Sequence, residues 1–303
     1  MLNKNLIITF IKLISGIISN SFILSRGKRL WEENTRDWNL PLTKIDKIIV
    51  GIHIILLDYS KGKFPPTFKD RQTAYKNEID FYKSIPGCTI LGHQDSEMRK
   101  PFGWGGVHIE RLVIDFIYII KVIEKLGIAK SNSKILEIGC GTGWMAELMA
   151  LSGYNVMGIS IAPFDIEIAN KRIESLIVKE LKYNLMFLIS DMEHVDNNLI
   201  EYLPFDFVFV YEALHHAYSW EETFHSVYKA LNQNGWFFIC KEPNLVHTFV
   251  AYRGTKQLKT HEIGLSRNKM IKELKYCGFK NIKCIKNRFN NLISPHWILA
   301  QKI

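Results

Sequence analysis

The sequence predicts an α/β protein: a doubly wound, mostly parallel sheet preceded by a mainly helical N-terminal region. From Lys134 onward, short apolar runs alternate with stretches of helical spacing, as in a parallel sheet with crossover helices. Two closing apolar runs have no full helix between them, which indicates an antiparallel pair at one edge. We therefore expect a helical region over residues 1–130 and a doubly wound α/β domain over residues 131–303.

Five strands are expected before the closing pair, each a short apolar run bounded by turn residues. They are KILEI (134–138), YNVMGI (154–159), LMFLIS (185–190), FDFVFVY (205–211) and WFFICKE (236–242). The closing pair is NIKCIKNRF (281–289) and HWILAQKI (296–303). Helices are expected between these strands, and apolar residues at three-to-four spacing predict two more over 71–85 and 110–128. The apolar run within 44–60 is too short to cross a bilayer and suits a buried helix.

The apolar stretch Leu6–Leu24 is interrupted by polar residues that recur every three to four positions, including Thr9 and Lys12. This periodicity favours an amphipathic helix over a membrane span. Such a helix packs on the domain or lies on a membrane surface beside Arg26, Lys28 and Arg29. Both interpretations stay open, so peripheral membrane contact is one of them.

Composition narrows the class of protein. The net charge is +9, with most of the excess before residue 131, which suits an anionic partner or a plain solvated surface. The five cysteines are scattered and never form a C-x-x-C pair, which argues against a disulfide framework and favours a cytoplasmic protein. The histidines show no metal-ligand spacing, so no metal site is expected.

A glycine-rich turn between the first strand and its helix is the most specific signal. In ILEIGCGTGW (135–144), glycines occupy every second position after Ile138, where the chain turns and a ligand approaches the backbone. The dinucleotide pattern G-x-G-x-x-G does not fit, because the third glycine comes one residue early.

The spacing E-x-G-x-G-x-G resembles the first motif of class I S-adenosylmethionine-dependent methyltransferases, and the resemblance extends from about Ser131 to Ile303. It implies the strand order 3-2-1-4-5-7-6, S-adenosylmethionine as cofactor and S-adenosylhomocysteine as product. In SDMEHV, it implies that Asp191 binds the adenine amine and that Met192 packs on the ring. The cofactor-binding residues expected on this basis are Glu137, Gly139, Cys140, Gly141, Gly143, Ser160, Asp191, Met192 and Tyr211.

The second strand departs from the family pattern, in which an acidic residue at its end takes both ribose hydroxyls. Here that position is Ser160, which lacks the charge that strengthens such a bond. Losing one charge-assisted bond weakens cofactor affinity by about 1–3 kcal/mol. Asp165, five residues on, is expected inside the next helix and not as a substitute.

Candidates for a catalytic base are expected above the carboxyl ends of the strands. His215 and His216 follow the fourth strand, with Glu212 just before them, and a histidine suits proton abstraction near neutral pH. The alternative is that one histidine of the pair is structural. Two loops are expected to line the acceptor site, one through Trp104 and His108 and the other through His261 and Glu262.

The residues after the fourth strand also restrict the acceptor. The tetrapeptide YEAL (211–214) differs from the N-P-P-Y pattern of base amino methyltransferases, and no nucleophilic cysteine is present there, so no specific nucleic acid is expected. The remaining acceptors are a small molecule, sugar or lipid-like compound, methylated on oxygen, with N-methylation as the alternative. Two other classes stay open: a degenerate scaffold with this fold, and an accessory protein at a membrane surface.

Overall fold

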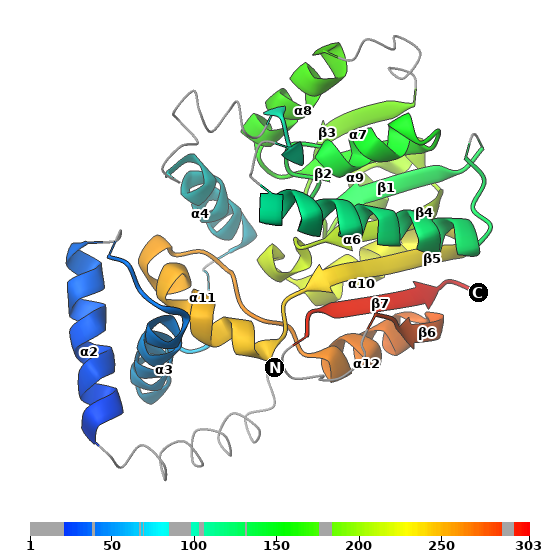
Figure 1. The fold of residues 1–303 in the computed structure, drawn as a ribbon. Helices are drawn as coiled ribbons and strands as arrows, with labels where there is room; N and C mark the ends of the chain where they lie inside the picture. The colour runs from blue at the N-terminus through cyan, green and yellow to red at the C-terminus, as the bar shows by residue number, and fades with distance from the viewer. Residues whose placement is uncertain are drawn as a thin grey trace. The chain divides into compact units, whose positions relative to one another are not determined.

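The computed structural model shows helices and strands in the predicted alternation (Figure 1). It describes residues 21–37, 40–66, 68, 70–84, 98–102, 106–130, 132–175, 184–286 and 294–303. The chain divides into two compact units that interleave in sequence. Unit 1 comprises Met1–Asn77 with Leu245–Gly264, and unit 2 comprises Glu78–Asn244 with Leu265–Ile303. A catalytic domain that begins at residue 131 stays a prediction.

Unit 2 contains the sheet. Within the described residues, seven strands form one sheet in the order β3-β2-β1-β4-β5-β7-β6, which confirms the expected order. The strands are β1 (Lys134–Ile138), β2 (Asn155–Ser160), β3 (Leu185–Ile189), β4 (Phe205–Tyr211), β5 (Leu231–Glu242), β6 (Lys280–Cys284) and β7 (His296–Gln301). Strands β1 to β5 pair in parallel, and β7 is antiparallel to both of its neighbours.

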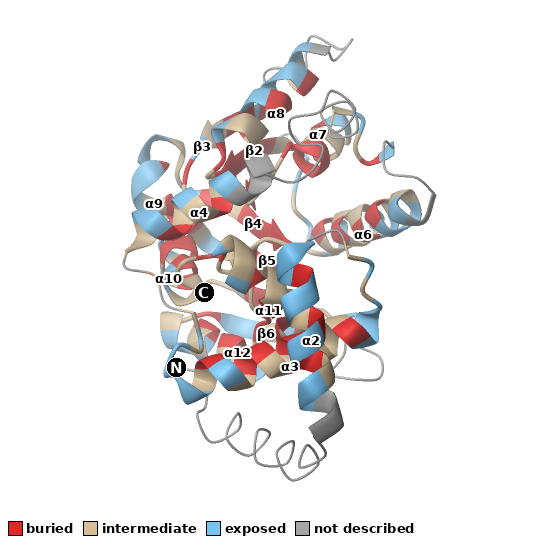
Figure 2. Ribbon diagram, turned by 90° about the vertical axis from the view of Figure 1, so that its left-hand side faces the viewer, coloured by how far each residue is buried: buried red, intermediate tan, exposed pale blue. Residues whose placement is uncertain are grey.

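Each face of the sheet has its own apolar core, because successive residues of a strand point to opposite sides. In β4, Val208 and Val210 join the core on the side of α9, α10 and α12, while Phe207 and Phe209 join the core with α6, α7 and α8. Every residue of β4 except Asp206 is buried, and Figure 2 shows the strand inside the layers of helices. Burial on both faces explains why this strand reads as a continuous hydrophobic run.

The helices of unit 2 cover these two faces. They are α6 (Gly106–Lys125), α7 (Trp144–Leu151), α8 (Pro163–Ser175), α9 (Val195–Asn198), α10 (Trp220–Ala230) and α12 (Arg267–Cys277). Short 3-10 turns occupy Ile200–Tyr202 and Leu214–His216. Helix α4 (Arg71–Ser84) begins in unit 1 and ends in unit 2.

The described residues of unit 1 are mainly helical, as the sequence predicts for its N-terminal part. It contains α2 (Ser21–Arg36), α3 (Lys44–Ser60) and α11 (Leu245–Leu258). Helix α3 coincides with the predicted buried helix 44–60 and begins at Thr43, whose side chain forms a reciprocal capping box with Asp46. The core of the unit includes Leu30, Val50, Ile54 and Tyr252.

Helices α3 and α11 approach each other closely at Gly51. A Cβ built on Gly51 would lie 1.8 Å from the carbonyl oxygen of Phe249, so only glycine fits there. Polar contacts reinforce the pair, since the Asp58 carboxylate accepts hydrogen bonds from Tyr252 Oη at 3.0 Å and Lys256 Nζ at 2.8 Å. Helix α11 is therefore an integral element of unit 1.

The membrane question concerns the N-terminal stretch. None of the helices in the described part of the chain combines the length and apolarity that a bilayer crossing requires. Most of Leu6–Leu24 lies outside the described residues, so an amphipathic helix there and its membrane contact stay predictions.

Candidate active site

The glycine loop connects β1 to α7, and its three glycines meet different surroundings. A Cβ on Gly139 would lie 2.4 Å from Ala213 Cβ, and one on Gly143 would lie 2.4 Å from the Phe187 ring. Both positions therefore need glycine for packing within the protein. A Cβ on Gly141 would meet no heavy atom within 4 Å, which leaves open space beside the loop backbone. The loop thus has a packed side and an open side, as a ligand cradle requires.

Glu137 lies on β1, just before this loop, and is 3% exposed. Its Oε2 atom is buried without a hydrogen-bond partner. Burial raises the pKa of Glu137 to about 8, although a hydrogen bond from the Ala146 backbone and the charge of Lys100 oppose that shift. An unsatisfied buried carboxylate oxygen is costly, so this atom fits a cationic or N–H ligand group.

The raised pKa of Glu137 predicts how stability depends on pH. Between about pH 4.5 and 8, the folded protein keeps a proton that the unfolded chain loses, so the free energy of unfolding falls as pH rises. We expect Glu137→Gln to remove much of this fall in urea titrations of cofactor-free protein. A residual fall of the same sign remains, because burial also raises the pKa of Glu242, to about 7.

The exposed Glu201 provides a matched control for this measurement. Glu201→Gln is expected to leave the pH dependence of the free energy of unfolding as it is in the wild type. If the free energy of unfolding of Glu137→Gln falls with pH as steeply as that of Glu201→Gln, Glu137 does not keep a proton in the folded protein.

Arg172 of α8 anchors a segment next to this site. Its guanidinium donates to Met98 O at 2.7 Å, to Lys100 O at 2.6 Å and to Glu147 Oε2 on α7 at 2.6 Å. The arginine side chain is 6% exposed, so these charge-assisted bonds are shielded from water. They fix residues 98–102 where the charge of Lys100 acts on Glu137.

Ser160 is the last residue of β2, and its side chain is hydrogen-bonded to a nearby carboxylate. Its hydroxyl donates to Asp165 Oδ2 at 3.1 Å and accepts from the Ala162 backbone at 3.2 Å. Asp165 lies in the first turn of α8, as expected, but its side chain turns back to the strand end. Its charge also acts on Cys140 in the glycine loop, whose pKa is raised mainly by burial. A carboxylate therefore stands at the end of β2 after all.

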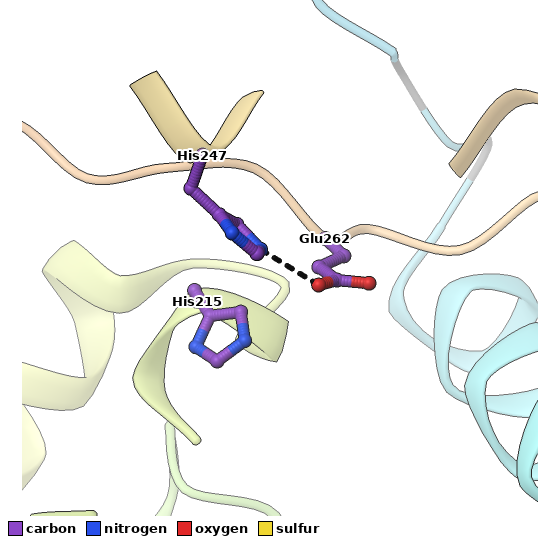
Figure 3. A group of neighbouring side chains, drawn as sticks. All are labelled: His215, His247 and Glu262. Carbon is purple, nitrogen blue, oxygen red and sulfur yellow. Dashed lines mark hydrogen bonds and ion pairs between the residues drawn. The ribbon is translucent and has the colours of Figure 1, made fainter. Parts of the chain in front are cut away.

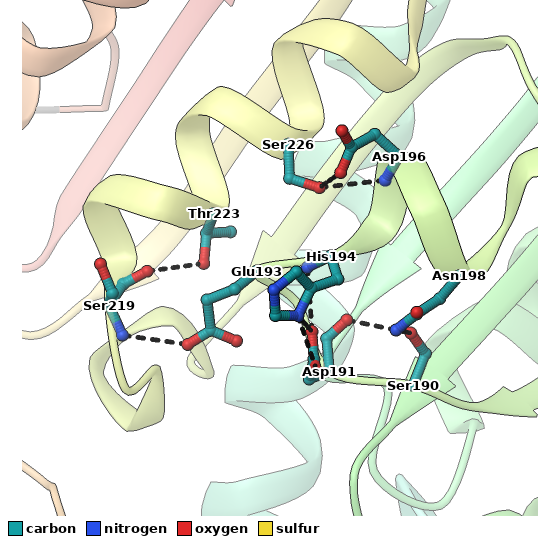
Figure 4. Close-up of polar contacts among 9 residues, drawn as sticks. All are labelled: Ser190, Asp191, Glu193, His194, Asp196, Asn198, Ser219, Thr223 and Ser226. Carbon is teal, nitrogen blue, oxygen red and sulfur yellow. Dashed lines mark hydrogen bonds and ion pairs between the residues drawn. The ribbon is translucent and has the colours of Figure 1, made fainter. Parts of the chain in front are cut away.

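Asp191 and Met192 follow β3. Figure 4 shows the contact between Asp191 and His194. The Asp191 carboxylate accepts the backbone N–H of His194 at 2.9 Å and lies 2.9 Å from its Nδ1. Met192 is buried in the core between the sheet and α10. Asp191 is thus held in a tight local turn, and its carboxylate is 21% exposed.

Tyr211 is the last residue of β4, Glu212 follows it, and both lie beside a buried charge cluster. The Tyr211 hydroxyl donates to Asp115 Oδ2 at 3.0 Å, and Lys241 and Lys286 contact the same carboxylate at 2.5 Å and 2.6 Å. The two lysines hold the pKa of Asp115 below its usual value against the opposing effect of burial. The hydroxyl of Tyr211 is therefore used within the protein, and only its ring remains for a ligand.

The ends of β4 and β5 also carry backbone strain. Glu212 has φ 48° and Lys241 has φ 57°, both in the left-handed region that non-glycine residues rarely adopt. Their side chains approach to 3.8 Å, and the Glu212 backbone donates to Cys240 O at 3.1 Å. Strain of this kind clusters at functional sites, where the surrounding structure over-determines it.

Glu242 at the end of β5 organises the turn that carries the two histidines. Its buried carboxylate accepts the backbone N–H groups of Ala213, Leu214 and His215 at 2.8, 2.9 and 3.1 Å. It also lies 2.9 Å from His215 Nδ1. His215 is therefore fixed through both its backbone and its ring, which suits a structural role.

His216 has a different partner. Its Nδ1 lies 3.3 Å from Glu78 Oε2, and its side chain is 17% exposed, twice as much as that of His215 at 8%. The two imidazole centroids are 4.1 Å apart. Of the two histidines, His216 is thus the better candidate for proton transfer.

The residues expected to line an acceptor site do not all lie in one unit. Glu212 belongs to unit 2, as does His108, which is exposed in the first turn of α6 and not in a loop, so the expectation of a loop at this position is wrong. His261 and Glu262 belong to unit 1, where the His261 ring packs against Phe68 and Glu262 pairs with His247 Nε2 at 2.8 Å (Figure 3). Trp104 lies outside the described residues. The lining of an acceptor site by these residues stays a prediction.

Residues 115–290, more than half of the chain, match the model of a family described as a methyltransferase domain. The chain belongs to the class I S-adenosylmethionine-dependent methyltransferases. S-adenosylmethionine is the cofactor of this family, as the resemblance of the glycine loop implies.

Relatives with known activities match this methyltransferase over part of their length. The ubiquinone biosynthesis O-methyltransferase of Hydrogenovibrio crunogenus is 36% identical over 136 residues, which cover 45% of this chain and 51% of that protein. The sterol 24-C-methyltransferase of Saccharomyces cerevisiae is 28% identical over 203 residues, covering 59% and 49%. The methyltransferase thus spans about half the length of the curated relatives it matches.

Among solved structures, the magnesium protoporphyrin IX methyltransferase of Synechocystis PCC 6803 with bound S-adenosylhomocysteine has a TM-score of 0.54. It is 14% identical, and the match covers 76% of this methyltransferase and all of that chain. At this identity the likeness shows the fold.

Proposed function

We propose that this methyltransferase transfers the methyl group to an oxygen atom of a small-molecule, sugar or lipid-like acceptor. The observation that carries the proposal is the packing of the histidine turn on the glycine loop, where Ala213 leaves no room for a Cβ on Gly139. A methyl donor on the loop and a proton acceptor on the turn would share one edge of the sheet. The similarity to an O-methyltransferase supports oxygen as the acceptor atom.

The residues around the glycine loop fit S-adenosylmethionine. The open side at Gly141 admits a ligand against the backbone, and the unpartnered Glu137 Oε2 suits the ammonium group of its methionine part. The Ser160–Asp165 pair offers a hydroxyl and a carboxylate to the ribose hydroxyls, which compensates for the missing acid at the end of β2. We assign the remaining expected contacts to Gly139, Cys140, Gly143, Asp191, Met192 and the ring of Tyr211.

Bound S-adenosylmethionine supplies a methyl group on a positively charged sulfur. His216 accepts the proton of the acceptor hydroxyl as the carbon–oxygen bond forms, while the electron pair of the carbon–sulfur bond returns to sulfur. Glu242 holds the turn so that the imidazole is placed before the acceptor binds, which reduces the entropic part of the barrier.

Calorimetric titration with S-adenosylmethionine and S-adenosylhomocysteine tests the cofactor site. We expect micromolar binding to the wild type and none to Gly141→Arg, because the arginine would fill the open side of the loop. Gly127→Arg is the matched control: Gly127 shares the left-handed φ and open surroundings, at the end of α6, and its variant should bind normally.

The acceptor atom is then identified with methyl-labelled cofactor and a panel of phenols, sugars, lipids and amines. Labelled ethers are expected from a hydroxylated acceptor. Labelled amines or carbon-methylated products would contradict transfer to oxygen. Absence of binding by both cofactor forms would favour a scaffold with this fold.

A further inference from the structure

Glu78 is a buried carboxylate that the methyltransferase fold does not account for. It lies on α4, before the stretch that matches the family, and its side chain is 1% exposed. A buried carboxylate costs several kcal/mol unless a charge or hydrogen-bond partner compensates for it. Its Oε2 atom lies 3.3 Å from His216 Nδ1, within ion-pair distance but without the alignment of a hydrogen bond, so the helical N-terminal region supplies a negative charge to the histidine turn.

The neighbouring His215 shows what such a carboxylate does. Each of the two imidazoles presents Nδ1 to a different buried carboxylate, His215 to Glu242 and His216 to Glu78. Glu242 has a second role, because it also accepts hydrogen bonds from three backbone N–H groups. For His216, the carboxylate at Nδ1 favours a proton on that atom and leaves Nε2 as the basic nitrogen.

We propose that Glu78 is a positioning residue that fixes the orientation and tautomer of His216 for proton transfer. The proposal rests on the proposed function, in which His216 is the base. It gives the N-terminal region a part in the reaction, since the carboxylate that prepares the base comes from outside the family domain. A purely structural Glu78 would stabilise α4 and leave the ring protonation pattern of His216 unchanged when it is replaced.

The tautomer of His216 is measured on full-length protein labelled with ¹⁵N-histidine, using long-range proton–nitrogen spectra and His216→Gln to assign the ring. We expect the Nδ1–H form in the wild type. In Glu78→Leu, which removes every acceptor at that place, we expect a shift toward the Nε2–H form. Glu167→Gln, at an exposed ion pair on α8, serves as the matched control and should give the wild-type pattern.

Two further measurements keep the outcomes distinct. S-adenosylhomocysteine binding should be equal in Glu78→Leu and the wild type, because Glu78 has no proposed cofactor contact. If Glu78→Leu fails to fold, Glu78→Gln replaces it, with a mixture of both tautomers expected. An unchanged His216 pattern in the folded variant overturns the proposal. If the wild type does not bind the cofactor, the proposed function is contradicted, and the tautomer of His216 can still be interpreted.

A kinetic experiment uses the acceptor compound that the panel identifies. Glu78→Leu should lower kcat by ~10²-fold, in the range of lost general-base catalysis, with the KM for S-adenosylmethionine unchanged. A variant that keeps the wild-type kcat contradicts the positioning role.

Discussion

Gly51→Ala is expected to destabilise unit 1 severely, although alanine is the better helix former. The new Cβ would lie 1.8 Å from the Phe249 carbonyl oxygen and 2.7 Å from its carbonyl carbon. Both atoms are backbone, so α3 and α11 must move apart. Overpacking costs about 1–3 kcal/mol, and more where backbone must move, whereas the gain in helix propensity is only about 1 kcal/mol.

The measurement is the free energy of unfolding from urea titrations followed by circular dichroism. Leu57→Ala, at an exposed position of the same helix, is the control and should change the stability little. A Gly51→Ala protein as stable as the wild type would mean that the two helices do not approach as closely as Gly51 allows.

Glu242→Ala is expected to be similarly damaging, and to act on the site as well as on stability. The side chain is fully buried and satisfies three backbone N–H groups and the His215 ring. Removing one partner of a buried ionic network costs about 3–5 kcal/mol, because the groups left behind are desolvated and unpaired. The histidine turn then loses the support that holds Ala213 against Gly139.

The readout combines thermal unfolding with methyl transfer to an acceptor from the panel. Glu242→Gln keeps the shape and one acceptor oxygen, so it should lose less stability than Glu242→Ala and retain some activity. Equal stability of Glu242→Ala and the wild type would show that these hydrogen bonds contribute little. Lys272→Ala, a substitution on α12, is the control for surface changes.

The alternation of strands and helices from Lys134 onward could be predicted because each element has a clear local signal. Apolar runs of strand length are closed by turn residues, and β4 occupies the residues predicted for it, Phe205–Tyr211. Helix α11 gave no such signal. Its buried face consists of Thr248, Tyr252 and Thr255, which are not strongly apolar, so the helical period is hidden.

In the candidate site too, the sequence predicts local motifs but not contacts between residues that are far apart in the chain. The glycine loop is local and was recognisable. Asp165 was discounted because it lies inside a helix, yet the chain turns between β2 and α8, which returns that side chain to Ser160. The contact between Glu78 and His216 joins positions far apart in sequence, and no spacing rule predicts it. Glu242 had a usable signal, an acidic residue ending an apolar strand.

The bridge between the residues that follow β5 and precede α12 has a consequence for the length of the segment between them. The chain leaves unit 2 at Asn244 and re-enters at Leu265, and these two residues form a bridge, with Leu265 N donating to Pro243 O at 2.9 Å. An insertion whose ends already meet can lengthen, shorten or diverge without shifting the register of the strands on either side. The segment 245–264 can therefore change in length without shifting the strands, whereas α11 within it stays tied to α3 by the close approach at Gly51.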